Sequence, residues 1–549
     1  MTKDEQIKKQ QEEIQQLNKH IEEQNVIIAN LTETLEEFKR QFFGITSEKT
    51  KKKEVTDADT ADNKDSQSVT VKEHKRDRKP KSKREDIYAS LPVRKVLIPL
   101  TDEERNCPYC NTLLEHMTYK EVREEIQIIP AKVERVKYFK EVAICPECKK
   151  DGDGTIVEAQ APKALMPHSA ASASSVAYIM FQKVYMYLPY YRQESVMEQL
   201  GLKLSRETMS NWCIYCALNY MQPLYDMLHE LMLKRDIIHA DETVCQVLKE
   251  EGKTAESKSY MWIYTTGSDG LPSIVMYEYQ PGRAGNYAKN FLEGFSGLLQ
   301  CDGYTGYNKV EDVTLVCCLA HLRRKFYEAL PASYKKKIKL LDINSEQEIK
   351  KPILPDEESI KKMIPAEVGL VYCNCLFFIE RQLKGMPSEE RKEKRIELET
   401  PIWDAFWKWI STVNPLGGSK LAGAITYAQN HTDTLCNYML DGRCEISNNI
   451  CERKAKTYAI TRKNSLFHTS VDGAKASAIM HSIVETAKAN NLNVFQYIYT
   501  LLLYMPDYKN EPAGIEMLLP WSDFIKEHCT GIINEDENIT IENKIPLAI

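Results

Sequence analysis

One stretch of this 549-residue chain, from residue 235 to 330, limits the choice of fold more than any other. Apolar runs alternate there with short polar segments, which is the pattern of strands joined by turns. The expected elements are strands at 237–248, 260–265, 274–279, 298–304 and 314–319, with a short helix at 286–294 before the fourth strand. Because segment 249–258 is charged and turn-like, we expect the first three strands to form an antiparallel meander.

Two aspartates occupy distinctive places in this order of elements. Asp241 lies within the first strand, and Asp302 lies at the end of the fourth. The order is that of a ribonuclease-H-like fold, which holds an aspartate on its central first strand beside one at the end of the fourth. Adjacent carboxylates repel each other unless a cation lies between them, and hard oxygen ligands suit Mg²⁺ or Mn²⁺. Two such ions support phosphoryl transfer.

A third carboxylate is expected from a later helix, and Glu452 is the best candidate. Either residue of the pair Ser-Asn at 447–448 can cap a helix, which places Glu452 in its first turns. Two other carboxylates compete for this role. Glu445 precedes the cap in a loop, and Glu242 should lie on the opposite face of its strand from Asp241.

Basic side chains near these carboxylates suit a phosphodiester substrate. We expect DNA contacts from Arg323, Arg324, Lys325, Arg453, Lys454, Arg462 and Lys463. The run 323–325 is also compatible with a solvated helix face. His321 on the same predicted helix could orient a phosphate or a carboxylate, or have only a structural role.

Four cysteines form two CxxC pairs: Cys107, Cys110, Cys145 and Cys148. Structural zinc takes four ligands in a tetrahedron, and each pair supplies two thiolates from one turn. We therefore expect structural Zn²⁺, with residues 121–142 forming strands of a zinc-ribbon-like unit. Four thiolates leave no open position for catalysis. The other closely spaced cysteines, at 213 and 216, 317 and 318, and 373 and 375, are expected to be buried thiols.

The first 43 residues predict a single helix with an apolar residue every seven positions: Ile7, Ile14, Ile21, Ile28, Leu35 and Phe42. This is the pattern of a coiled coil, so we expect a homodimer or a higher oligomer. The alternative is a helix folded back onto its own chain.

Residues 48–86 are polar and charged, which predicts a disordered linker. The end of this linker, at 72–84, is a basic cluster suited to binding phosphates.

A helix-turn-helix is expected between residues 165 and 234. Two predicted helices, 172–187 and 191–200, are followed by a turn at Gly201 and a third helix capped by Ser205. In such a unit the residues at the start of the last helix read DNA, here Arg206, Ser210 and Asn211. An ordinary helical hairpin explains the same pattern.

Net charge, apolar runs and the N-terminal residues bear on the partners and the location of the protein. The net charge is −6, so DNA binding would depend on local basic patches rather than on overall charge. No apolar run approaches the roughly 18 residues of a membrane span, and the N-terminal residues are not a secretory signal. We therefore expect no membrane partner and a cytoplasmic location.

Several motifs together resemble the transposases of the IS66 family of bacterial insertion sequences. They are Phe-Gly-Ile-Thr-Ser-Glu-Lys (43–49), His-Ala-Asp-Glu-Thr (239–243), Asp-Gly-Tyr-Thr-Gly-Tyr (302–307), Ala-His-Leu-Arg-Arg-Lys-Phe (320–326), Asn-Asn-Ile-Cys-Glu-Arg (448–453), Arg-Lys-Asn (462–464) and Leu-Leu-Pro-Trp (518–521). The resemblance covers nearly the whole chain in the family's order.

The resemblance implies a DDE-type transposase whose Asp241, Asp302 and Glu452 bind two Mg²⁺ or Mn²⁺ ions. It implies hydrolysis at the ends of the element, followed by attack of the freed 3′-hydroxyl on target DNA. Its partners would be the terminal inverted repeats, target DNA and accessory proteins encoded by the same element. The protein would then lie in the bacterial cytoplasm, associated with the nucleoid.

The expected organisation is multidomain α+β. Its segments are a coiled-coil oligomerisation helix (1–47), a disordered basic linker (48–90), a zinc-binding module (91–160), a helical DNA-binding region (165–234), the first part of a ribonuclease-H-like core (235–330), a helical insertion (331–440), the second part of the core with the third carboxylate (441–505) and a C-terminal tail (506–549). Two alternatives remain: an inactive or repurposed sequence-specific DNA-binding protein, and a nuclease of the same fold without strand transfer.

Overall fold

The computed structural model describes residues 133–139, 142–144, 156–158, 163–335, 352–531, 544, 546 and 547. The predicted coiled coil, the basic linker and all four cysteines of the CxxC pairs lie outside these residues.

Two short strands lie within the expected zinc-binding module. Strand β1 (Val142–Ile144) pairs antiparallel with β2 (Ile156–Glu158). Residues 133–139, which we predicted to lie in strands, belong to no strand, and their side chains are exposed. The prediction was wrong there because alternating apolar residues form a strand only where a neighbouring strand accepts their hydrogen bonds. Among the described residues, none pairs with this segment.

The central sheet contains the five strands expected from the sequence, in the spatial order β5-β4-β3-β6-β7. They are β3 (Ile237–Lys249), β4 (Lys258–Thr266), β5 (Val275–Gln280), β6 (Leu298–Cys301) and β7 (Thr314–Cys317). Strands β3, β4 and β5 form the predicted antiparallel meander, whereas β6 and β7 run parallel to β3. A strand that the sequence did not reveal, β8 (His468–Ser470), pairs with the far end of β3.

The helices before the sheet include the two helices and the turn for which a helix-turn-helix or an ordinary helical hairpin was expected. The elements of this region are α4 (Ala173–Met180), a π-helical turn (Phe181–Tyr185), α5 (Tyr190–Gln199), α6 (Arg206–Cys216), a second π-helical turn (Ala217–Met221) and α7 (Gln222–Leu233). Gly201 takes a left-handed conformation with φ of +83°, which suits glycine in the turn between α5 and α6. Ser205 caps α6 by accepting a hydrogen bond from the backbone N–H of Thr208, as predicted.

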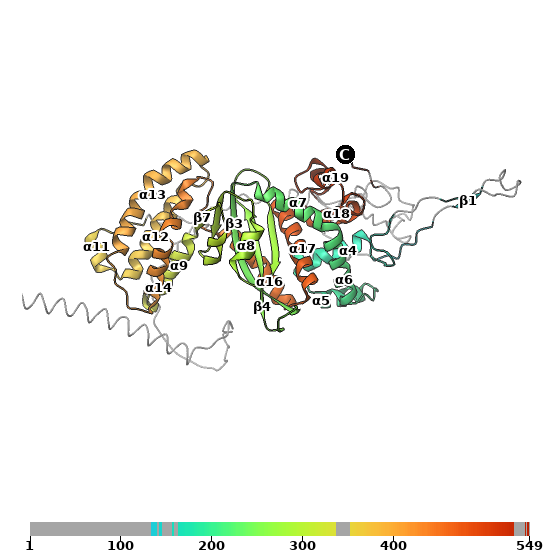
Figure 1. Ribbon diagram of the computed structural model, residues 1–549, viewed down its shortest axis with the longest axis horizontal. Coiled ribbons are helices and arrows are strands. Elements are labelled where there is room, and N and C mark those ends of the chain that lie inside the picture. The colour runs from blue at the N-terminus through green and yellow to red at the C-terminus, as the bar shows by residue number, and fades with distance from the viewer. Residues whose placement is uncertain are drawn as a thin grey trace, which may run out of the picture. The chain divides into compact units, whose positions relative to one another are not determined.

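The helices after the insertion pack on one face of the meander, along its β5 edge and on one another. They are α16 (Asn449–Ser465), α17 (Val471–Ala489) and α18 (Val494–Tyr508). Because side chains alternate along β3, Ile238 and Ala240 enter the core built with α4 to α7, whereas Cys245 and Val247 enter a second core built with α16 and α17. Figure 1 shows the sheet with these helices beside it.

Helix α17 also closes the edge of the sheet at β5. The backbone N–H of Val275 donates to Thr486 Oγ1 at 3.0 Å, and that of Tyr277 donates to Ser482 Oγ at 2.7 Å. The hydroxyl of Thr486 donates back to the carbonyl of Val275. An unpaired strand edge invites association with other chains, and these hydroxyls occupy it.

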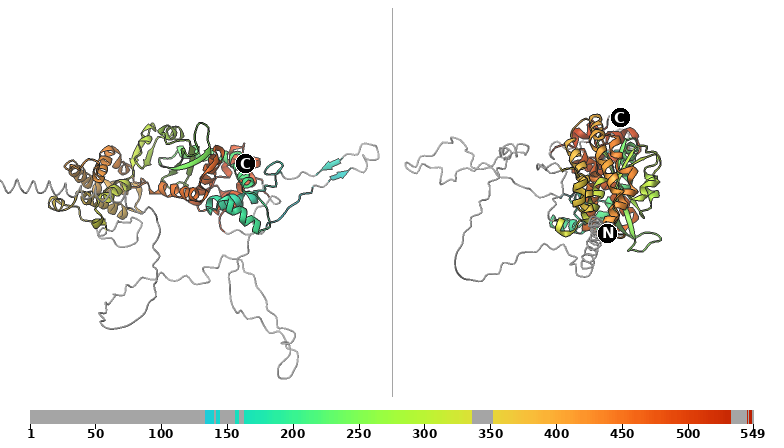
Figure 2. Two further views of the ribbon diagram at one scale, coloured as in Figure 1. Left: turned by 90° about the horizontal axis from the view of Figure 1, so that it is seen from below. Right: turned by 90° about the vertical axis from the view of Figure 1, so that its left-hand side faces the viewer.

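The insertion is helical, as predicted, and packs on the last strand–helix unit of the sheet. Its described elements are α10 (Ala332–Lys335), α11 (Glu357–Lys362), α12 (Pro365–Gln382), α13 (Ser388–Ile410), α14 (Lys420–Asn430), α15 (Thr432–Leu435) and a 3₁₀ turn (Asn437–Leu440). Helices α12 and α14 contact α9 (Leu319–Ala329), which follows β7. Figures 1 and 2 show the insertion, in yellow and orange, at the β7 end of the sheet.

The remaining described elements are α8 (Gly285–Phe291), a 3₁₀ turn (Thr305–Lys309), α19 (Pro512–Met517) and α20 (Asp523–His528). Leu518 and Ile525, near these last two helices, are buried in the same core as α18. The closely spaced cysteines named above, from position 213 to 375, are buried free thiols, as expected. None of the helices among the described residues is both long and apolar enough to cross a membrane.

A fully buried arginine joins the insertion to the segment that leads into α16. Arg395 on α13 donates to Glu380 Oε1 at 2.5 Å and Oε2 at 2.7 Å. It also donates to three backbone carbonyls, those of Tyr438, Asp441 and Cys444. This guanidinium therefore fixes the path of the chain just before the proposed third carboxylate.

We expect Arg395→Met to lower the free energy of unfolding by about 3–5 kcal/mol. Among the described residues, the change leaves Arg391 as the cationic partner of buried Glu380, and it leaves three backbone carbonyls without this donor. Urea unfolding would measure this loss. The control is Lys394→Met, whose side chain is 44% exposed and should change stability by less than about 1 kcal/mol. Equal stability of the two variants would contradict this role for Arg395.

A second stability prediction concerns pH. Burial raises the pKa of Glu278 on β5 to about 8, and its Oε2 has no hydrogen-bond partner among the described residues. Because this folded-state pKa lies above that of an unfolded glutamate, the wild-type protein should lose stability as the pH rises from about 5 through 8.

Glu278→Gln removes this titration. The stability of the variant relative to wild type should therefore rise by about 1.4 kcal/mol per pH unit over that interval and then level off. Urea unfolding at a series of pH values would measure the slope. The same change at Glu256, whose side chain is exposed, is the control. A flat difference for Glu278→Gln would show that this carboxyl titrates normally.

Candidate active site

Parallel pairing of β3 and β6 brings the two predicted aspartates together. The register pairs His239 with Gln300. Two residues further along each strand, the same register sets Asp241 opposite Asp302, which follows β6 directly. Adjacent strands lie about 4.8 Å apart, so these two carboxylates share one end of the strand pair.

The electrostatics of Asp241 agree with this crowding. Burial, together with the neighbouring carboxylates of Glu242, Asp302 and Glu452, raises the pKa of Asp241 to about 8. Neither Asp241 nor Asp302 forms an ion pair with a lysine or arginine of the described chain. The site therefore contains more negative charge than its own side chains neutralise.

Glu452 reaches this region from the first turn of α16, as predicted, because α16 packs against β3 and β4. Asn448, at the cap position of α16, is fully buried. We predicted that the side chain at position 447 or 448 caps this helix. In the structure the side chain of Asn448 makes no capping hydrogen bond. It donates instead to the carbonyl of Ala240 at 2.8 Å and lies 3.0 Å from His239 Nδ1. Its backbone N–H donates to Cys318 Sγ at 3.1 Å.

These contacts of Asn448 fix the start of α16 against the strand that contains Asp241 and against the N-terminal end of α9. Three segments distant in the sequence thus meet at one buried amide. The position of Glu452, one helical turn further on, follows from this junction.

Polar groups of α9 surround the carboxylate of Glu452. His321 Nδ1 lies 3.7 Å from Glu452 Oε1, and an Arg324 guanidinium nitrogen lies 3.8 Å from Oε2. Cys318 Sγ lies 4.0 Å from Oε1. Of the two roles left open for His321, the structure therefore favours contact with a carboxylate.

The two competing carboxylates have other partners. Glu242 accepts hydrogen bonds from the Tyr307 hydroxyl at 2.6 Å and from Arg283 Nε at 2.7 Å. Burial raises the pKa of Glu242, and these hydrogen bonds oppose the increase. Glu445 lies in a loop, as expected, 3.7 Å from Arg391. Glu452 thus remains the best candidate for the third carboxylate.

The insertion contributes to the surroundings of Asp302, which sequence reasoning did not foresee. The Tyr427 hydroxyl on α14 donates to the carbonyl of Asp302 at 2.7 Å. Gly303 has φ of +88°, and a Cβ there would lie 2.9 Å from both the Tyr427 hydroxyl and His431 Nε2. Only glycine therefore fits between the aspartate and the insertion. Lys325 stacks over the Tyr427 ring at 5.0 Å.

The predicted DNA-contacting cations fall into two groups. Arg324, Arg453 and Lys463 are exposed. The others have partners within the chain: Arg323 donates to Asn374, Lys454 pairs with Glu485, Arg462 donates to the carbonyl of Val244, and Lys325 contacts Tyr427. Of the residues proposed to read DNA on α6, Arg206 and Asn211 are exposed and Ser210 is partly exposed.

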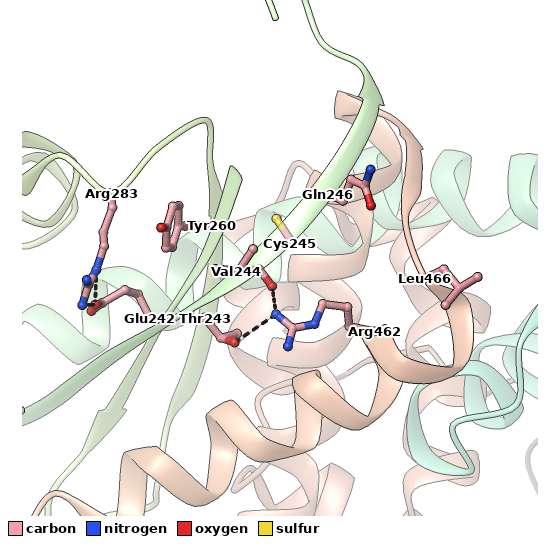
Figure 3. A pocket seen from close by; sticks show the side chains of 9 residues that line it. All are labelled: Glu242, Thr243, Val244, Cys245, Gln246, Tyr260, Arg283, Arg462 and Leu466. Carbon is pink, nitrogen blue, oxygen red and sulfur yellow. Dashed lines mark hydrogen bonds and ion pairs between the residues drawn. The ribbon is translucent and has the colours of Figure 1, made fainter. Parts of the chain in front are cut away.

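A cavity of about 530 Å³ lies beside Glu242, along the part of β3 between its pairings with β6 and β8. Figure 3 shows Arg283 turned toward Glu242, and Arg462 reaching Thr243 and Val244 from α16. The cavity is lined by Glu242, Thr243, Val244, Cys245, Gln246, Tyr260, Arg283, Arg462 and Leu466.

Comparison with known proteins identifies the family. The model described as Transposase IS66 family matches residues 168–476, which is more than half of the chain. The chain belongs to the IS66 transposase family. Two further models of this group match: the zinc-finger binding domain of transposase IS66 at residues 104–149, and Transposase C of IS166 homeodomain at residues 30–96. The zinc-finger match spans both CxxC pairs and supports a Zn²⁺ site in this IS66 transposase.

Relatives in Sinorhizobium fredii have no assigned activity. The uncharacterized protein y4qI is 29% identical over 417 residues, covering 73% of this chain and 70% of that protein. The uncharacterized protein y4jD is 27% identical over 435 residues, covering 76% and 78%.

The junction at Asn448 gives a direct prediction. Asn448→Ala leaves the carbonyl of Ala240 and the ring of His239 without their partner. We expect a loss of about 1–3 kcal/mol in the free energy of unfolding for each buried group left unpaired. Urea unfolding would measure it. Asn449→Ala, one position along on the same helix and only partly buried, should cost less than about 1 kcal/mol. If both variants unfolded alike, Asn448 would not hold α16 in place.

Proposed function

We propose that this IS66-family protein is a DDE transposase with a ribonuclease-H-like catalytic core. The observation that carries the proposal is the parallel register that sets Asp241 on β3 opposite Asp302 after β6. Glu452, in the first turn of α16, lies near enough for its charge to raise the pKa of Asp241. The strand order β5-β4-β3-β6-β7 agrees with the core expected from the sequence. Membership of a transposase family supplies the reaction class.

The donor set fits divalent cations of the Mg²⁺ class. Three carboxylates supply hard oxygen ligands, and the raised pKa of Asp241 means that its ionised form requires a nearby positive charge. We propose Asp241, Asp302 and Glu452 as the ligands of Mg²⁺ or Mn²⁺. When bound, such ions lower the pKa of water and stabilise the developing charge on the leaving oxygen.

The chain's own residues would hold the DNA and the carboxylates. His321 and Arg324 lie near Glu452 and orient it, while Tyr427 fixes the turn after Asp302. The exposed cations Arg324, Arg453 and Lys463 are placed to contact phosphates. Hydrolysis at the element's ends frees 3′-hydroxyls, which then attack target DNA.

The segments outside this core would recognise and pair the DNA ends. We propose Cys107, Cys110, Cys145 and Cys148 as the Zn²⁺ ligands, and α6 as the helix that reads the terminal inverted repeats with Arg206, Ser210 and Asn211. The N-terminal helix would join protomers into a dimer or higher oligomer, because two ends must be cut and joined together. Accessory proteins of the same element would complete the assembly.

The test uses purified full-length protein with labelled DNA that carries the ends of the host element, a target plasmid, and Mg²⁺ or Mn²⁺. We expect nicking at the ends and joined products. Asp241→Asn, Asp302→Asn and Glu452→Gln should each reduce both by more than about 100-fold, because losing a metal ligand removes several kcal/mol of transition-state stabilisation. Glu445→Gln is the matched control for Glu452→Gln and should keep its activity.

The products of this assay distinguish a transposase from a DNA-binding protein and from a nuclease of the same fold. Binding without either product, with accessory proteins present, would favour a DNA-binding protein that does not cut. Nicks without joined products would favour a nuclease of the same fold. Cleavage that persists in the three variants would show that the assigned carboxylates are wrong.

A further inference from the structure

We propose a second, separate metal site in this protein, formed by Cys318, His321 and Glu452, that takes a borderline-soft divalent cation of the Zn²⁺ class. It lies outside the CxxC module, and it shares one carboxylate with the proposed catalytic site. Its ligand atoms, one from each residue, all lie within 4.8 Å of one another.

The distances suit a small tetrahedral ion. Bonds of about 2.3 Å to sulfur and about 2.1 Å to nitrogen or oxygen give a tetrahedron whose ligand atoms are roughly 3.4–3.6 Å apart. In the protein, His321 Nδ1 lies 3.7 Å and Cys318 Sγ lies 4.0 Å from Glu452 Oε1. Shifts of a few tenths of an ångström would close these two pairs around an ion, and the third pair, Cys318 with His321, lies within 4.8 Å and would close with a shift of up to about 1 Å. One position would remain open for water.

A second observation also points to a ligand at this place. His321 Nδ1 is shielded from solvent and makes no hydrogen bond with any residue that the structure describes. Buried polar atoms without a hydrogen-bond partner are rare in folded proteins and call for an explanation such as an ion. A cation at this site would use the lone pair of this nitrogen.

The three ligands are held in place by the fold. Cys318 and His321 occupy the cap and the third position of α9, and the sulfur accepts a hydrogen bond from the backbone N–H of Asn448. Glu452 approaches from α16. Because burial raises the pKa of the Cys318 thiol to about 12, binding must release the thiol proton to solvent.

The choice of ion follows from the chemistry of the ligands. A thiolate and an imidazole select Zn²⁺ over Mg²⁺, which prefers oxygen ligands only. Given the proposed function, occupation of this site would draw Glu452 away from Asp241 and Asp302. A soft ion would therefore oppose Mg²⁺-dependent cleavage.

Cobalt provides the direct test, because Co²⁺ replaces Zn²⁺ and absorbs in the near-ultraviolet when a thiolate binds it. The full-length protein is first given one equivalent of Zn²⁺, which the four-thiolate module takes, and is then titrated with Co²⁺. We expect a thiolate band that saturates at one Co²⁺ per chain. Cys318→Ser, which keeps an acceptor for Asn448, should abolish the band, and His321→Ala should weaken binding at least about tenfold.

Cys317→Ser is the matched control, since its buried sulfur contacts Tyr427 and belongs to no metal cluster of the described residues. It should keep the band. Circular dichroism would confirm that each variant is folded. A cobalt band unchanged in Cys318→Ser, or no band in the wild-type protein, would overturn the proposal.

A second measurement tests the effect on the reaction. Micromolar Zn²⁺ added to the Mg²⁺-driven cleavage assay should reduce cleavage by the wild-type protein at least about tenfold and spare Cys318→Ser. If Zn²⁺ inhibited the wild-type protein and Cys318→Ser equally, the inhibitory Zn²⁺ would lie at the carboxylates. That result would refute the proposal that Zn²⁺ bound at Cys318 opposes Mg²⁺-dependent cleavage. If neither protein cleaves DNA, the proposed function fails, whereas the cobalt band still decides whether the site exists.

Discussion

The candidate site depends on one pairing, that of β3 with β6. The parallel register sets Asp241 on β3 opposite Asp302, the first residue after β6, so a slip of one residue would move Asp241 to the other face of the sheet. The register is held because alternate residues of β3 enter two different cores. Packing on both faces therefore fixes the geometry of the carboxylates.

The third carboxylate is positioned differently, because Glu452 follows Asp302 by 150 residues and lies on a helix rather than on the sheet. The buried amide of Asn448 bonds to β3, and its backbone N–H bonds to Cys318 before α9. Arg395 holds the preceding segment through three carbonyl groups and anchors it to the insertion. The insertion is thus part of the support of the site, which explains why it packs on α9.

The sequence predicted the five strands and their meander because buried strands are apolar runs between turns. It did not predict β8, since His468–Ser470 is short and has no apolar pattern. Asp241, Asp302 and Glu452 could be chosen from their places in the element order. The role of Asn448 could not, because its side chain resembles any helix cap until its partners on β3 are known.

The roles of the basic residues could not be predicted either, because their partners lie on segments distant in the sequence. Local sequence places Lys454 and Arg462 beside the site, yet Lys454 pairs with Glu485 on α17 and Arg462 donates to the backbone of β3. Their charges are used to join α16 to its neighbours, which leaves Arg453 and Lys463 as the exposed cations of that helix among those we predicted.

The surroundings of Glu452 combine two opposing chemistries. A thiol and an imidazole of the α9 segment lie close to its carboxylate, and its charge also raises the pKa of Asp241 on β3. Mg²⁺ needs oxygen ligands, and a thiolate site excludes it. A single carboxylate cannot serve both proposed metal sites at once, so under these two proposals the availability of Glu452 depends on which metal is present.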